Sequence, residues 1–109
     1  MIIEYSDNFL KEAKKLSKNF RLLKSDLEEA IGEIEQNSDF GVSLGCNLFK
    51  KRIKNSSIPT GKSGGFRVII YLQLEDKIVL ISIYSKTEKE SLSDNELREL
   101  VEQHFKGEK

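Results

Sequence analysis

The sequence has few of the residues that build disulfides, metal clusters and membrane spans. Cys46 is its one cysteine and His104 its one histidine, which excludes an internal disulfide and a zinc site made of histidine and cysteine. No apolar run approaches the ~18 residues of a transmembrane helix. The first residues lack the cationic lead and the long apolar stretch of a signal peptide. We therefore expect a soluble cytoplasmic protein that uses no metal and no cofactor.

The sequence does contain enough apolar material for one hydrophobic core. Its 109 residues are 38% hydrophobic and 33% charged, with one proline and seven glycines, which excludes collagen-like, low-complexity and most disordered classes. A chain of this length buries about two-thirds of the surface that it exposes when unfolded. Two independent cores would each be too small to be stable, so we expect one domain over residues 1–109.

Acidic residues are missing from the middle third of the sequence. The window 40–74 contains no aspartate or glutamate and carries six basic residues. The flanking segments 1–39 and 75–109 each carry nine acids and six bases, so the formal net charge of the chain is zero. Because charges act over about 8 Å at physiological salt, the local excess matters more than the total. The window predicts either a surface for an anionic partner or a solvated sheet edge.

Hydrophobic periodicity predicts two helices in the N-terminal third. A β-prone segment over 1–5 comes first, and Asp7 is then the expected N-cap of a helix near 8–18. The capping-box spacing that begins at Ser25 predicts a second helix up to about residue 36, and the adjacent Leu22 and Leu23 either extend this helix or form the joint between the two helices.

The period of the hydrophobic pattern then changes from 3.6 to 2, after a glycine-containing loop predicted over 39–47. Three strands are predicted, over 48–54, 66–74 and 77–84, of which the last two form a hairpin with apolar residues on both faces. A Ser93 capping box opens a final amphipathic helix. The fold class is therefore α+β, a small antiparallel sheet packed with two N-terminal helices and a C-terminal helix.

Cations from separate stretches of the sequence could meet on one surface of this sheet. They are Lys50, Arg52, Lys54, Lys62, Arg67 and Lys86. Such a basic pocket suits a phosphodiester, because Arg and Lys can neutralise the charge that builds on phosphorus oxygens during a displacement. RNA carries its own nucleophile, the 2′-hydroxyl, so a metal-free site needs only alignment, charge stabilisation and proton transfer. The alternative, a face that binds RNA without turnover or is merely solvated, stays open.

Alternation along the strands decides which of these cations share a face. Lys50, Arg52 and Lys54 are expected on one face of the strand 48–54. Arg67 projects from a neighbouring strand, on the side opposite its apolar row. A cation flanked by apolar strand residues would be costly to bury without a purpose, so Arg67 is the strongest candidate.

Two segments of the sequence resemble the RelE/HigB group of type II toxins, in the RelE/ParE superfamily. They read GKSGGFR at 61–67 and YSKTEK at 84–89, and a capped C-terminal helix follows them. The order of the predicted elements also agrees over nearly the whole chain. The resemblance implies an mRNA interferase, an endoribonuclease that cleaves mRNA in the ribosomal A site without metal, by attack of the 2′-hydroxyl on the adjacent phosphate.

The resemblance also implies roles for individual residues and for partners. It implies catalytic roles for Lys62, Arg67 and Lys86. RNA-binding roles are expected for Lys50, Arg52, Lys54 and Tyr84. The implied partners are a cognate antitoxin in a hetero-oligomer, mRNA, and the ribosome with its ribosomal RNA, and no membrane is involved. Two alternatives share the fold: a ParE-like toxin that poisons DNA gyrase, and a catalytically silent homologue that only binds its antitoxin.

Overall fold

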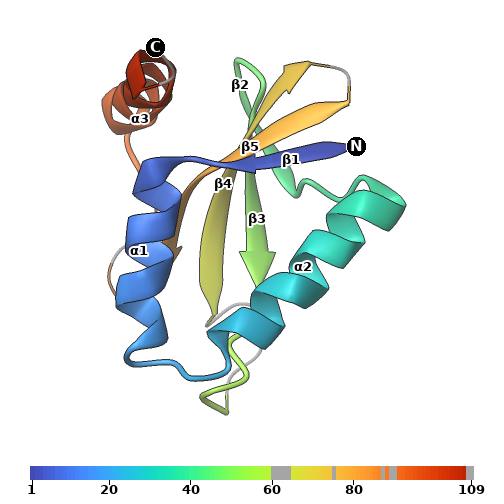
Figure 1. The fold of residues 1–109 in the computed structure, drawn as a ribbon, viewed down its shortest axis with the longest axis vertical. Coiled ribbons are helices and arrows are strands. Elements are labelled where there is room, and N and C mark those ends of the chain that lie inside the picture. Colours follow the sequence, from blue (N-terminus) through green and yellow to red (C-terminus); the bar gives the residue numbers. More distant parts are fainter. Residues whose placement is uncertain (60–64, 75, 87, 89–90, 108–109) are drawn as a thin grey trace.

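The chain folds around one five-stranded sheet with the strand order β1-β5-β4-β3-β2 (Figure 1). The computed structural model describes residues 1–59, 65–74, 76–86, 88 and 91–107. The strands within these residues are β1 (Ile2–Tyr5), β2 (Val42–Gly45), β3 (Leu48–Ile53), β4 (Phe66–Leu74) and β5 (Lys77–Ser85). The helices within them are α1 (Asp7–Ser17), α2 (Leu23–Asn37) and α3 (Asp94–Gly107). None of these helices combines the length and the apolar character that crossing a membrane requires.

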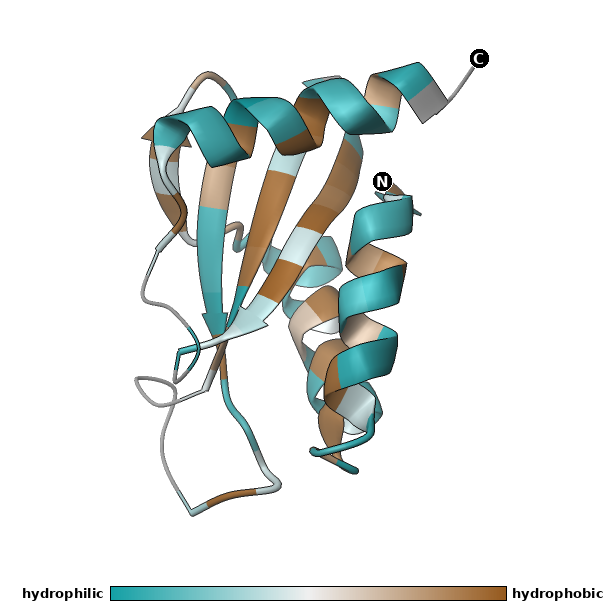
Figure 2. Ribbon diagram, turned by 90° about the vertical axis from the view of Figure 1, so that its left-hand side faces the viewer, coloured by the Kyte–Doolittle hydropathy of each residue, from teal (hydrophilic) through white to brown (hydrophobic). Residues whose placement is uncertain are grey.

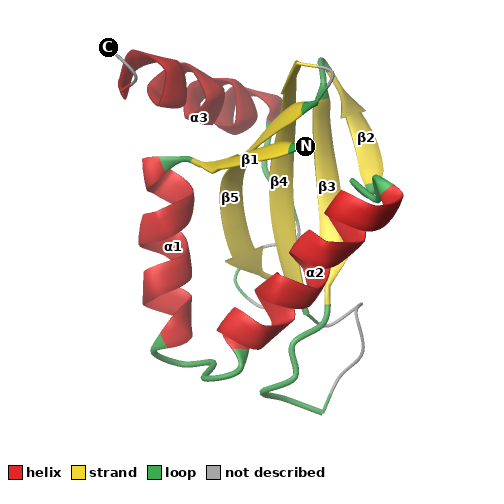
Figure 3. Cartoon of the chain, turned by 45° about the vertical axis from the view of Figure 1, so that its right-hand side comes forward, coloured by secondary structure: helices red, strands yellow, loops and turns green. Residues whose placement is uncertain are grey.

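The sheet separates two apolar layers. One layer packs α1 and α2 against the face that carries Phe66, Val68 and Ile70 (Figure 3). The other packs α3 against the opposite face, with Ile69 and Val79 in its core. Figure 2 shows the hydrophobic strands beneath the largely hydrophilic ribbon of α3. The sequence predicts a hairpin with apolar residues on both faces, and the structure buries both of these faces; the α+β class is confirmed as well.

The helix starts agree with the sequence at α3 and differ from it at α1 and α2. At α3 the reciprocal capping box is present, since the amide of Glu96 donates to the hydroxyl of Ser93 at 3.2 Å and the Ser93 amide donates back to the carboxylate at 3.0 Å. At α1 the N-cap is Ser6, whose hydroxyl accepts from the amide of Phe9 at 3.0 Å, so the expectation of Asp7 was wrong by one residue.

Helix α2 begins two residues before Ser25, the predicted start. Leu22 occupies its N-cap position and offers no side-chain cap. Instead the amide of Leu22 donates to the hydroxyl of Ser57 at 3.0 Å, from a segment 35 residues further along the chain. A tertiary contact therefore takes the place of the local cap, and the predicted capping box at Ser25 was wrong.

The edges of the sheet also depart from expectation. Strand β1 pairs with β5 in parallel, whereas the other strand pairs are antiparallel. Strand β1 pairs with a strand more than 70 residues further along the chain, so the local sequence pattern does not predict its direction. The segment 39–47, predicted as a loop, contains β2, whose residues are all exposed and therefore carry no alternating burial signal.

Helix α1 also covers the part of β5 that extends beyond its pairing with β1, which ends at Leu80. The carboxylate of Glu12 accepts a hydrogen bond from the hydroxyl of Ser82 at 2.7 Å and another from the backbone amide of Ile83 at 3.2 Å. The carboxylate thus binds a backbone donor that a further strand would otherwise pair with. This protects the edge from pairing with another chain.

Candidate functional site

Three of the predicted site residues form one cross-strand row on the face that α3 packs against. Arg52 of β3 is paired with Arg67 of β4, and Arg67 is paired with Tyr84 of β5. Directly opposed residues of an antiparallel sheet point to the same face, so the three side chains are neighbours. Arg52 is exposed, whereas Arg67 is 4% exposed and Tyr84 is 2% exposed.

The pairing of Arg52 with Arg67 is unusual because like charges directly opposite each other destabilise a sheet. Arg67 is buried, and one of its guanidinium nitrogens, Nη1, donates to the carbonyl of Phe66 at 3.3 Å. Its side chain lies on the face opposite Phe66 and Val68, as the sequence predicts, and the structure shows that α3 packs against that face. Two arginines opposed in neighbouring strands are an arrangement that favours binding of an anion such as a phosphate.

Tyr84 lies within the electrostatic reach of this row and of α3. Burial raises the pKa of the Tyr84 phenol above its ordinary value, the positive charge of Arg67 lowers that pKa, and the negative charge of Glu96 raises it. The first turn of α3 therefore lies near the row. The ring of Tyr84 packs in the apolar layer under α3. Glu96 was missed as a site neighbour, since the sequence marked it only as a capping residue.

The other lysines of the predicted site differ in position. Lys50 is half-buried and lies two residues before Arg52, so it points to the same face of β3. Lys86 is half-buried and follows β5, and its backbone amide donates to the carbonyl of Gly65 at 3.1 Å. Lys62 lies outside the described residues.

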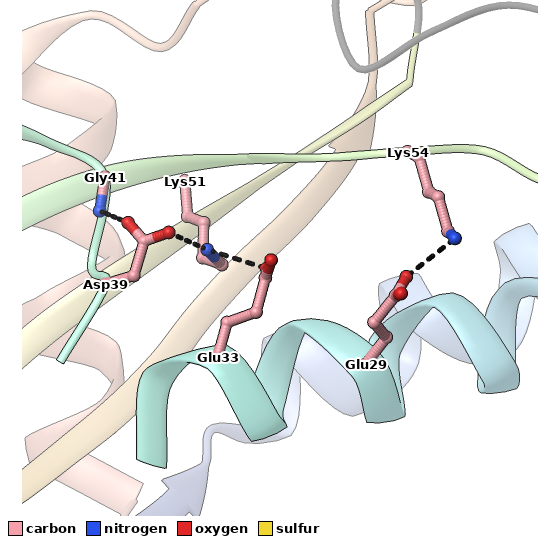
Figure 4. Close-up of polar contacts among 6 residues, drawn as sticks. All are labelled: Glu29, Glu33, Asp39, Gly41, Lys51 and Lys54. Atoms are coloured by element: carbon pink, nitrogen blue, oxygen red, sulfur yellow. Dashed lines mark hydrogen bonds and ion pairs between the residues drawn. The ribbon is translucent and has the colours of Figure 1, made fainter. Parts of the chain in front are cut away.

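The expectation that Lys54 shares the face of Lys50 and Arg52 was wrong. Strand β3 ends at Ile53, so alternation does not extend to Lys54. Its ammonium group lies 2.8 Å from the carboxylate of Glu29 on α2, on the opposite side of the sheet (Figure 4). The hydrogen bond to Glu29 raises the pKa of Lys54, and the negative charge of the same carboxylate raises it further. Lys54 thus belongs to the α2 side.

Lys51 joins the same acidic side of α2. Its ammonium group is 3.1 Å from Glu33 and 3.0 Å from Asp39, and its side chain is only 3% exposed. Asp39 also accepts from the amide of Gly41 at 3.3 Å, as Figure 4 shows. The acid-free window is therefore not one basic surface: α2 and the residues after it neutralise the cations on one face, while Lys50, Arg52 and Arg67 lie on the other.

The described residues contain no cluster of three or more histidine, cysteine, aspartate or glutamate side chains placed to hold a metal ion. The chemistry that this surface can perform is that of its cations: binding a phosphate group and stabilising added negative charge on its oxygens.

Comparison with known proteins points to one family. A family model described as the RelE toxin of the RelE/RelB toxin–antitoxin system matches residues 8–105. Among solved structures, the chain is similar to a double arginine-to-alanine mutant of the E. coli toxin RelE in the free state. The TM-score is 0.53 at 16% identity, over 96% of this chain and 94% of that chain. At this identity the likeness shows the fold. No curated protein sequence matches.

Proposed function

The chain belongs to the RelE toxin family, and from this premise we propose that it inhibits translation as a ribosome-dependent endoribonuclease that cleaves mRNA. Membership in the family implies an antitoxin as its partner. The proposed hetero-oligomer with that antitoxin forms in the cytoplasm, and the free toxin acts on mRNA bound to the ribosome.

The observation that carries this proposal is the opposed pair of arginines. Arg52 is exposed and free to approach the RNA backbone, while Arg67 is buried beside it. The burial of Arg67 holds its guanidinium group in place before RNA arrives, so little reorganisation is needed when charge develops on the phosphate.

The proposed reaction needs no external nucleophile. The 2′-hydroxyl oxygen attacks the adjacent phosphorus and loses its proton, the bond from phosphorus to the 5′ oxygen breaks, and that oxygen takes up a proton. The products are a 2′,3′-cyclic phosphate and a 5′-hydroxyl end. Arg67 is proposed to stabilise the negative charge on the non-bridging oxygens, and Lys62 is proposed to assist it. Lys86, just beyond β5, is proposed to lie near the leaving oxygen. Lys50 and Arg52 are proposed to guide the RNA.

The test is translation of a defined message with the purified toxin, followed by primer extension on ribosome-bound and on naked RNA. The wild type should cut only the ribosome-bound message. Arg67→Ala should lower the cleavage rate by roughly 10²–10³, the loss typical of removing one group that stabilises an oxyanion. Arg67→Lys should recover only part of the rate, because an ammonium group cannot bind phosphate in a bidentate manner.

The matched control is Arg98→Ala, which removes an exposed arginine from α3 and should leave cleavage unchanged. Unchanged cleavage by Arg67→Ala would contradict the proposal. DNA damage before any loss of mRNA in induced cells, with no cuts in the message, would instead identify a gyrase poison.

A further inference from the structure

Helix α2 holds the chain that follows β3 through a buried carboxylate. Asp26 is 3% exposed, and both of its carboxylate oxygens bind the same residue. Its Oδ2 accepts from the backbone amide of Ser56 at 2.8 Å, and its Oδ1 accepts from the Ser56 hydroxyl at 2.6 Å. Two bonds to one residue fix both the distance and the orientation of Ser56 relative to α2. The bond from Leu22 to Ser57 adds a third tie nearby.

Asn55, which precedes Ser56, lies close to Gly65 at the ends of three strands. Gly65 packs so closely on the end of β3 that a Cβ at this position would overlap the carbonyl oxygen of Ile53 and lie 3.1 Å from the amide nitrogen of Asn55. On its other side, the carbonyl of Gly65 accepts from the amide of Lys86 at 3.1 Å. The ends of β3, β4 and β5 therefore meet at Gly65.

The proposed catalytic cations Arg67 and Lys86 lie next to this junction. Arg67 follows Gly65 by two residues along β4, and Lys86 is bonded to Gly65 through its backbone. If Ser56 moved, Asn55 and Gly65 would therefore shift with it. Arg67 and Lys86 would then be displaced as well. Phosphoryl displacement is sensitive to such shifts, because misplacement by about 1 Å can cost 10²-fold in rate.

We propose that Asp26 is a positioning residue for mRNA cleavage, which fixes from helix α2 the strand-end junction that places Arg67 and Lys86. This inference rests on the proposed function and adds to it a residue from the opposite side of the sheet. Asp26 does not touch the substrate. An acid on the buried face of α2 could also serve stability alone, so the experiment must separate geometry from folding.

The experiment measures two quantities on the full chain, in the variants Asp26→Ala, Ser56→Ala and Ser56→Thr. The first is the hydrogen-exchange rate of the Lys86 amide, which reports the junction directly. The second is the rate of cleavage of ribosome-bound mRNA, divided by the folded fraction from circular dichroism. Ser25→Ala is the matched control, because Ser25 is exposed on the same helix beside Asp26.

We expect Ser56→Ala to accelerate exchange of the Lys86 amide and to lower the rate per folded molecule, each by roughly tenfold, because a hydrogen bond to a charged group is lost. Asp26→Ala should have the larger effect on both. Ser56→Thr should restore both by restoring the hydroxyl, and Ser25→Ala should change neither.

Three outcomes would overturn the positioning role. One is an unchanged exchange rate of the Lys86 amide in Asp26→Ala. Another is a loss of cleavage that disappears once the rate is divided by the folded fraction, which would leave Asp26 a purely structural role. A third is no rescue by Ser56→Thr. A wild type that cleaves no message would overturn the proposed function instead, and the exchange of the Lys86 amide would then decide whether Asp26 anchors the junction.

Discussion

The buried ammonium group of Lys51 allows a quantitative test of the assignment of Lys51 to the α2 face of the sheet, through the free energy of unfolding. Its side chain is 3% exposed, whereas its partners Glu33 and Asp39 are 35% and 51% exposed. Removing a charge from water costs several kcal/mol, and here the two carboxylates offset that cost. Removing the lysine should therefore lower the free energy of unfolding much less than removing both of its partner carboxylates.

Lys51→Met should change the free energy of unfolding by only about 1 kcal/mol, because methionine fills a similar volume and the two released carboxylates return to water. The double variant Glu33→Gln with Asp39→Asn leaves the ammonium group buried without a partner carboxylate. It should cost about 3–5 kcal/mol. Each single substitution should cost less than half as much, since one carboxylate remains in each case.

The assay is urea denaturation followed by circular dichroism, at one ionic strength for all variants. Cleavage of ribosome-bound mRNA is measured alongside, and Lys51→Met should keep it because Lys51 lies on the α2 side of the sheet. The reasoning is refuted if Lys51→Met destabilises the fold as much as the double variant does. Loss of cleavage by a well-folded Lys51→Met would place Lys51 in the RNA-binding surface after all.

Three further substitutions test other parts of the structure. Gly65→Ala should destabilise the fold by about 1–3 kcal/mol, visible as a lower melting temperature, because the new Cβ overlaps the carbonyl of Ile53. Glu12→Ala should cost about 1–3 kcal/mol in urea unfolding, since it leaves the amide of Ile83 without its acceptor, and an unchanged midpoint would contradict this. Burial raises the pKa of Tyr84 above 10.0, so its phenol stabilises the fold below pH 10 and this contribution is lost as the pH rises through the raised value. Tyr84→Phe should therefore lose less stability than the wild type between neutral pH and about pH 11 in urea unfolding.

Strand alternation is strong enough in the central hairpin to predict the face of each side chain. Alternation along β4 places Arg67 on the face opposite Phe66, Val68 and Ile70, and the structure shows that α3 covers that face. The same reasoning places Lys50 and Arg52 on one face of β3 and Lys51 on the other. Which residue of β3 lies opposite Arg67 depends on the strand register, which the structure supplies.

Strand alternation does not predict the direction of side chains beyond the end of a strand. Lys54 lies one residue beyond β3, and the approach of Glu29 rather than the pleat decides where its ammonium group points. For the same reason the bonds of Asp26 to Ser56 could not be foreseen. They join residues 30 positions apart, and the sequence shows Asp26 only as one of several acids on a helix.

The amino-acid sequence by itself determined the class of the fold, the central hairpin, the capped final helix and the placement of Arg67 on the side of its strand opposite Phe66 and Val68. These features depend on periodicity and capping, which act between residues a few positions apart. Only the tertiary structure decided that β1 runs parallel to β5, that α2 neutralises Lys51 and Lys54, and that Arg67 lies opposite Arg52. Such contacts depend on which surfaces meet when the layers pack. They join residues that are far apart in the sequence, so local periodicity does not predict them.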